Sequence, residues 1–204
     1  MNATLAQRAL PISNAAFRNI LLAVAGSLLV AGAAQVSVPF WPVPMTLQTL
    51  AVLLVGGAYG ARLGAATLGL YALEGAIGLP FFAGGKAGLF DAKLDYLLPA
   101  SSMGYVAGFI CAAALVGYLA QTGWISSTAR MVVATLAGAA ILYVPGLIWL
   151  GIWAAKTQGL DFNAAVHAAL DWGFFPFVRG DLVKATIAGL GLSAGWRGMK
   201  NWSE

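Results

Sequence analysis

The chain has 204 residues, of which 60% are hydrophobic and 9% are charged, and its mean hydropathy is +0.83. Soluble domains carry about 25% charged residues, so this composition excludes an ordinary soluble protein and predicts one embedded in a lipid membrane. The formal net charge of +4 comes from basic residues scattered along the chain, which argues against a nucleic-acid partner, and the lone Cys111 excludes a disulfide within the chain.

Six apolar segments, taken in chain order, are predicted to cross the bilayer as helices. About 20 apolar residues in helical conformation span the hydrocarbon layer. We therefore expect an all-α integral membrane protein: a single domain over residues 1–204, with six transmembrane helices and long outer loops that close a ligand pocket. The expected helices cover about 16–36, 46–59, 63–79, 104–120, 131–155 and 181–196.

The first predicted helix carries small residues at every fourth position, Ala23, Ser27 and Ala31. Residues four apart lie on one face of a helix, and small residues let membrane helices approach closely. Two partners are open for this stripe: another helix of the same chain, or a helix of a second protein.

A proline-rich segment, Val38 to Met45, separates the first two predicted helices. Proline removes a backbone donor and breaks a helix, so the three prolines predict an irregular loop. We expect the aromatic Trp41 of this loop at the membrane interface or inside a cavity. The second helix then begins near the polar Gln48.

An acidic residue, Glu74, lies inside the third predicted helix. A carboxylate within a membrane span is a candidate functional residue, although a position near the helix end also lets it reach water. The long loop from Phe81 to Met103 follows, and such loops are commonly lids or binding loops. Its glycines around Lys86 suit close approach of the backbone to a ligand.

The basic residues predict the orientation of the chain in a bacterial inner membrane. With six helices both termini share one side, where six basic residues face the single acid Glu204, whereas acids balance the cations on the other side. Cytoplasmic loops are enriched in Lys and Arg, so we expect a multi-pass protein with both termini in the cytoplasm. The six basic residues are Arg8, Arg18, Arg62, Arg130, Arg197 and Lys200.

Asp181 and Lys184 lie three residues apart, a spacing that places both on one helix face. We expect Asp181 to open the last helix, after a loop that ends at Gly180. Mutual neutralisation at the interface is one explanation of the pair, and a binding site near the outer face is the other. The positive field of a helix start and two nearby loops rich in glycine and aromatic residues favour a site. A carboxylate accepts hydrogen bonds and an ammonium donates them, so the expected ligand has an apolar body, donors, acceptors and a carboxylate.

The sequence lacks the zinc-protease motif H-E-x-x-H and the Walker A motif of ATPases. We therefore expect no enzyme, no cofactor and no metal. His167 and Asp171 lie four residues apart and are better explained as polar positions of an amphipathic surface helix at about 163–170. Without a Walker A motif, uphill transport needs either an ATPase on another chain or an ion gradient.

Three stretches together resemble the BioY family, the biotin-binding S components of energy-coupling factor (ECF) transporters. They are VPFWPVPMTLQTLAVLLVGG (38–57), GAIGLPFFAGG (75–85) and RGDLVKA (179–185), in the order and spacing of the family. The resemblance implies a six-helix membrane protein that captures biotin from outside. It also implies a transmembrane ECF coupling subunit and a pair of ATPases as partners.

The resemblance further implies which residues bind. Asp181 and Lys184 match the D-x-x-K residues that hold the biotin head group in the family, and Lys86 stands where the family has an Asn that contacts biotin. Gln48 matches the family's P-V-P-x-x-L-Q, and Tyr105 keeps the family Tyr. The expected substrate-binding residues are Asp181, Lys184, Lys86, Gln48, Tyr105, Trp41, Phe82 and Glu74, and the expected docking stripe for the coupling subunit is Ala23, Ser27 and Ala31.

Three alternatives stay open from the sequence alone. The first is a self-sufficient, ion-coupled biotin transporter in which Glu74 carries a proton. The second is an S component for another small vitamin. The third is a membrane enzyme that uses Glu74, His167 or Asp171.

Overall fold

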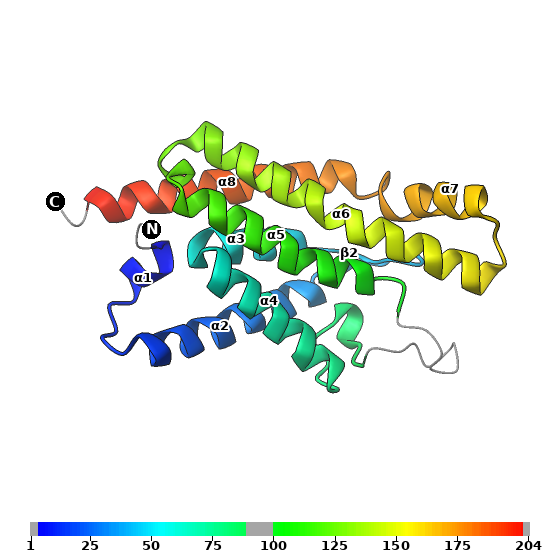
Figure 1. The fold of residues 1–204 in the computed structure, drawn as a ribbon, viewed down its shortest axis with the longest axis horizontal. Helices are drawn as coiled ribbons and strands as arrows, with labels where there is room; N and C mark the ends of the chain where they lie inside the picture. Colours follow the sequence, from blue (N-terminus) through cyan, green and yellow to red (C-terminus); the bar gives the residue numbers. More distant parts are fainter. Residues whose placement is uncertain (1–3, 89–99, 202–204) are drawn as a thin grey trace.

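The structure is a computed structural model that describes residues 4–88 and 100–201. Figure 1 shows that the chain is built almost entirely from helices that run roughly side by side. The long helices are α2 (Ala15–Gln35), α3 (Gln48–Tyr59), α4 (Ala61–Ala76), α5 (Met103–Gln121), α6 (Thr128–Gln158), α7 (Phe162–Gly173) and α8 (Val178–Asn201). The short elements are α1 (Leu5–Ala9), β1 (Ser37–Val38), β2 (Met45–Thr46) and the 3₁₀ turns η1 (Ala83–Gly85) and η3 (Trp124–Ser126).

Three of the described helices, α2, α5 and α6, are long and apolar enough to cross a membrane. At a rise of about 1.5 Å per residue, some 20 residues match the hydrocarbon layer, and α6 has 31. The outer faces of these helices expose large apolar side chains, including Leu28 and Leu29 on α2 and Val144 and Ile148 on α6. Surfaces of this kind are rare on soluble monomers and fit contact with lipid, as expected from the composition.

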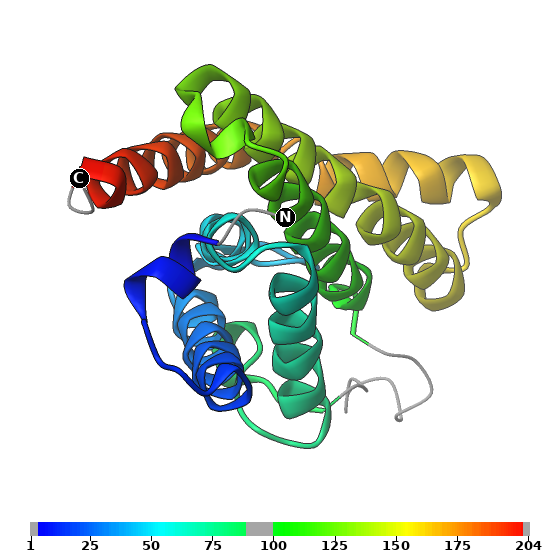
Figure 2. The same cartoon turned by 60° about the vertical axis from the view of Figure 1, so that its left-hand side comes forward.

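Helix α5 is central in the molecule, packed against α3 and α4 on one side and against α6 on the other (Figure 2). Glycines allow this close packing. A Cβ at Gly108 of α5 would lie 2.9 Å from the Cα of Leu142 on α6, and one at Gly56 of α3 would lie 2.7 Å from the Cα of Ala113 on α5. Helix α8 packs against α6 and α3, where Thr135 of α6 donates to the carbonyl of Ala185 at 2.8 Å. These contacts fix the helices that surround the site.

Several predicted boundaries need correction. The loop at 38–45 is not wholly irregular, because its ends pair as antiparallel strands, Ser37 with Thr46 and Val38 with Met45. The second helix therefore begins at Gln48 and not at residue 46. The third helix covers Ala61–Ala76 and ends before Pro80, with Ile77 as its C-cap. The expected surface helix is present as α7, and α6 continues as one helix through Pro145.

The start of the last helix is also corrected. Helix α8 begins at Val178, so Gly180 is helical and does not end a loop. The backbone N–H of Asp181 donates to the carbonyl of Phe177 at 2.9 Å. Asp181 therefore belongs to the first turn but does not open the helix, and its own N–H is not a free donor.

The small-residue stripe of α2 packs within the chain. Ser27 is fully buried and Ala31 is 6% exposed, and a Cβ at the neighbouring Gly26 would lie 2.6 Å from the side chain of Thr67 on α4. The structure therefore shows that part of the stripe packs against a helix of the same chain, one of the two partners that the sequence left open. Ala23, the third residue of the stripe, is half-buried, and docking of a second protein on this helix stays a prediction.

Candidate functional site

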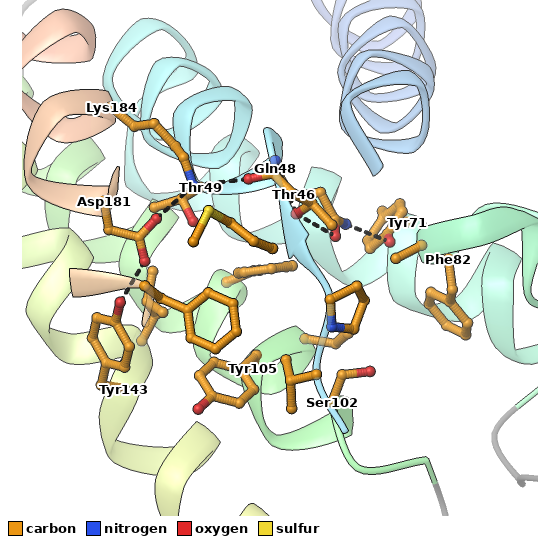
Figure 3. A pocket seen from close by; sticks show the side chains of 18 residues that line it. Thr46, Gln48, Thr49, Tyr71, Phe82, Ser102, Tyr105, Tyr143, Asp181 and Lys184 are labelled. Atoms are coloured by element: carbon orange, nitrogen blue, oxygen red, sulfur yellow. Dashed lines mark hydrogen bonds and ion pairs between the residues drawn. The ribbon is translucent and has the colours of Figure 1, made fainter. Parts of the chain in front are cut away.

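A pocket lies among β2, α3, α4, α5, α6 and α8, each of which contributes lining residues (Figure 3). Most of its wall is apolar, with Val106, Phe109, Leu142 and Phe177 among the lining residues. The polar lining residues are Thr46, Gln48, Thr49, Tyr71, Ser102, Tyr105, Tyr143, Asp181 and Lys184. An apolar cavity with a few convergent polar groups is typical of a small-molecule site.

Asp181 and Lys184 form an ion pair at one end of this pocket. Lys184 Nζ lies 2.8 Å from Asp181 Oδ1, and the two side chains are 14% and 8% exposed. Both come from the first two turns of α8, where the spacing of three residues places them on one face. Each charge is largely removed from water, so each depends on the other for compensation.

Two further contacts orient the pair. Lys184 Nζ donates to the backbone carbonyl of Thr46 at 2.8 Å, which joins α8 to strand β2. Tyr143 Oη, from α6, donates to Asp181 Oδ2. An ammonium has three donor hydrogens and a carboxylate has about four acceptor positions. The described contacts use two of each, which leaves one donor and two acceptor positions for a ligand.

Polar contacts continue from the ion pair to the loop that follows α4, as the dashed lines in Figure 3 trace in part. The hydroxyl of Thr46 donates to Gln48 Oε1 at 3.1 Å, and Gln48 Nε2 donates to Tyr71 Oη at 2.7 Å. Tyr71 Oη in turn donates to the carbonyl of Phe81 at 3.3 Å. Phe82, next in the chain, packs edge-on against Tyr71 with ring centroids 5.7 Å apart. The pocket lining of α3 and α4 is thus connected to the loop at 81–88.

Two tyrosines make the opposite wall. The hydroxyl of Tyr105, on α5, donates to the carbonyl of Gly173 at 2.9 Å. Its ring packs edge-on against Tyr143, which also packs edge-on against Phe174. These contacts immobilise Tyr143, and a rigid Tyr143 holds the Asp181 carboxylate in one orientation.

Five of the eight substrate-binding residues expected from the sequence line the pocket: Asp181, Lys184, Gln48, Tyr105 and Phe82. The other three lie elsewhere. Trp41 is 66% exposed and packs against Trp172, and Lys86 is exposed, its carbonyl accepting from the N–H of Phe82. Glu74 is half-buried on α4, and its Oε2 finds no partner among the described residues. The part of the long loop at 89–99 lies outside the described residues.

The sequence did not single out Tyr143, Tyr71, Thr46 or Phe177 as pocket residues. Tyr71 and Tyr143 carried a usable signal, since each places a hydroxyl inside a predicted membrane span, where an unpartnered polar group is unfavourable. Thr46 had no such signal, because it contacts Lys184 through its backbone carbonyl, a group that every residue has. His167 and Asp171 are both exposed on α7, and the described residues include no cluster of three or more His, Cys, Asp or Glu that would hold a metal.

Comparison with known proteins gives consistent matches. The model of the BioY family matches residues 4–201. A protein of Thermotoga maritima named biotin transporter BioY is 34% identical over 164 residues, which are 80% of this chain and 86% of that protein. A protein of the same name from Rhizobium etli is 33% identical over 162 residues, or 76% and 79% of the two chains.

A solved structure has the same fold. The crystal structure of the S-component for biotin from an ECF-type ABC transporter superposes with a TM-score of 0.67, covering 90% of this chain and 93% of that one. The sequence identity is 20%, so this match concerns the fold alone.

Proposed function

The chain belongs to the BioY family, and from this premise we propose that it is the biotin-binding membrane component of a vitamin uptake system. Relatives in this family are transport proteins and not enzymes, and the chain is no enzyme either. The observation that carries the proposal is the buried Asp181–Lys184 pair at the end of an apolar pocket. We further propose that α3, α4 and α8 complete six spans in a single membrane domain, with both termini in the cytoplasm.

The polar groups left free in the pocket suit the head group of biotin. Its ureido ring has two N–H donors and one carbonyl, its thiophane ring is apolar, and its valerate chain ends in a carboxylate. In our proposal the two ureido N–H groups donate to Asp181, and the remaining Lys184 hydrogen goes to the ureido carbonyl. Phe82, Phe109 and Phe177 bury the thiophane ring. Hydrogen bonds to charged groups contribute about 1.5–3 kcal/mol each and a buried CH₂ about 0.8 kcal/mol, so several such contacts reach the roughly 12 kcal/mol of nanomolar binding.

Uptake requires partners in this proposal. Because the chain carries no Walker A motif, an ECF transmembrane coupling subunit and ATPase subunits would supply the energy, and biotin would be captured from the outer face. The fold shared with an ECF S-component supports this arrangement.

Ligand binding by the purified protein tests the function directly. The full chain in detergent is titrated calorimetrically with biotin, thiamine and riboflavin in parallel. We expect tight binding of biotin and none of the other two. Binding of thiamine or riboflavin in place of biotin would refute the proposal in favour of an S component for another vitamin, and mass spectrometry showing chemically altered biotin would favour an enzyme.

Replacing Tyr143 by Phe is expected to weaken biotin binding about fivefold. The hydroxyl orients Asp181 and does not itself bind the ligand in our proposal, so its loss should cost binding about 1 kcal/mol, less than the roughly 1.5–3 kcal/mol of a direct hydrogen bond to a charged group. The ring contacts with Tyr105 and Phe174 remain. Calorimetric titration with biotin measures the change, and Tyr118→Phe is the matched control because Tyr118 is 54% exposed on α5. Tighter binding by Tyr143→Phe would instead mean that the hydroxyl competes with the ligand for Asp181.

Glu74→Gln separates the proposal from its main rival, a self-sufficient ion-coupled transporter. Glu74 lies outside the described pocket, so we expect the change to alter biotin affinity by no more than about twofold. The chain alone, in vesicles without ATPase partners, should not accumulate biotin with or without the substitution. Proton-driven uptake by the chain alone that Glu74→Gln abolishes would support the rival, since the buried Oε2 atom would then be the proton carrier.

A further inference from the structure

The end of the molecule that carries both chain termini is strongly basic. Helices α2, α4 and α6 begin at this end, and α3, α5 and α8 finish there (Figure 1). Five arginines lie at this end, each on a different helix: Arg8 on α1, Arg18 on α2, Arg62 on α4, Arg130 on α6 and Arg197 on α8. The acidic residues of the described ranges, Glu74, Asp161, Asp171 and Asp181, all lie toward the opposite end.

These five arginines are not neutralised within the described ranges, where the one ion pair joins Lys184 to Asp181. Arg8 lies over the ring of Trp196, 4.4 Å from its centroid, and Arg18 donates to the carbonyl of Ile12 at 3.4 Å. Neither contact brings a negative charge. The side chains of Arg8, Arg62, Arg130 and Arg197 are exposed. This end of the chain therefore presents four exposed positive charges that an external anion can reach, and the half-buried Arg18 adds a fifth charge beside them.

Helix stability does not account for the arginines. Arg18, Arg62 and Arg130 lie in the first turn of α2, α4 and α6. The start of a helix carries the positive end of its dipole, which disfavours a cation there. An anion that compensates these charges from outside removes this disadvantage.

We propose that this basic end face binds the phosphate headgroups of anionic phospholipids in the adjacent leaflet. A guanidinium matches phosphate oxygens with two parallel hydrogen bonds. The arginines come from five different helices and so are spread over the end face, a distribution that fits several lipid headgroups better than one acidic patch on a partner protein. The opposite end offers no net attraction, because its described cations, Lys86, Lys156, Arg179 and Lys184, equal its described acids in number.

Lipid retention by the purified full chain tests the proposal. The protein is prepared in mixed micelles with phosphatidylglycerol or with phosphatidylcholine, and native mass spectrometry counts the lipids that stay bound. A juxtamembrane Arg contributes about fivefold to binding of an anionic surface. We expect Arg62→Gln/Arg130→Gln to weaken phosphatidylglycerol binding at least tenfold, to leave phosphatidylcholine binding unchanged, and to be less sensitive to salt than the parent protein, because three of the five arginines remain.

The matched control removes the same charge from the other end. Arg179 and Lys156 are both exposed, so Lys156→Gln/Arg179→Gln should keep phosphatidylglycerol binding. Thermal unfolding in phosphatidylcholine verifies that each double variant is folded. Equal retention of the two lipids by the parent protein, or equal losses in the two double variants, overturns the proposal. Unchanged phosphatidylglycerol binding in Arg62→Gln/Arg130→Gln also overturns it and leaves an acidic protein surface as the partner of this face. The test is independent of biotin, so its result does not depend on the proposed function.

Discussion

Replacing Asp181 by Asn is expected to weaken biotin binding about a hundredfold. The side chain keeps its size but loses both the charge and part of the acceptor capacity that the ureido N–H groups need. Lys184 would then remain as a charge only 14% exposed without its partner, and removal of one member of such a pair is strongly unfavourable. A loss of about 3 kcal/mol, the upper value for a hydrogen bond to a charged group, corresponds to a factor of roughly one hundred.

Calorimetric titration of the purified variant with biotin measures this loss. Asp171→Asn is the matched control, because Asp171 is exposed on α7 and the same chemical change there should leave affinity unaltered. Thermal unfolding of both variants shows whether the protein remains folded. If folded Asp181→Asn binds biotin as the parent does, the ion pair is not the head-group site and the proposed role of Lys184 fails with it.

The sequence alone was sufficient to predict that Asp181 and Lys184 lie side by side. A carboxylate and an ammonium three residues apart in an apolar segment are unusual, and their spacing alone places them on one helix face. The groups that contact this pair could not be predicted from the sequence. The carbonyl of Thr46 and the hydroxyl of Tyr143 come from segments far away in the sequence, and only the packing of β2 and α6 against α8 brings them to the pair.

Prediction from the sequence was least reliable where a glycine or a stripe of small residues fits more than one structural role. Gly180 was predicted to end a loop, but it lies within α8. The first turn of this helix already forms before Asp181, whose N–H donates to the carbonyl of Phe177. Ser27 and Ala31 fit either an internal or an external helix, and only tertiary packing shows that both are buried within the chain. Aromatic residues in loops were also ambiguous: Phe82 enters the pocket, whereas Trp41 packs outside it against Trp172.

The close packing of α5 on α6 also determines the pocket, and Gly108→Leu is expected to disrupt both. A Cβ at Gly108 would lie 2.9 Å from the Cα and 3.1 Å from the carbonyl carbon of Leu142, and backbone atoms cannot rotate aside as a side chain does. Overpacking a core typically costs about 1–3 kcal/mol. We expect a cost at or above the upper end, seen as a lower thermal unfolding midpoint of the purified protein.

The same substitution at Gly69 of α4 is the control, since no atom beyond the adjacent backbone of its own helix lies within 4 Å of a Cβ there. Gly69→Leu should be at least as stable as the parent, because leucine favours a helix more than glycine does. Separation of α5 and α6 would also move Tyr105 and Phe109 away from Leu142 and Tyr143, which line the pocket from the two helices. Biotin affinity should therefore fall in whatever fraction of Gly108→Leu remains folded. A Gly108→Leu protein with the stability and affinity of the parent would mean that α5 and α6 can separate without changing the pocket, and that the orientation of Tyr143 toward Asp181 does not depend on their contact.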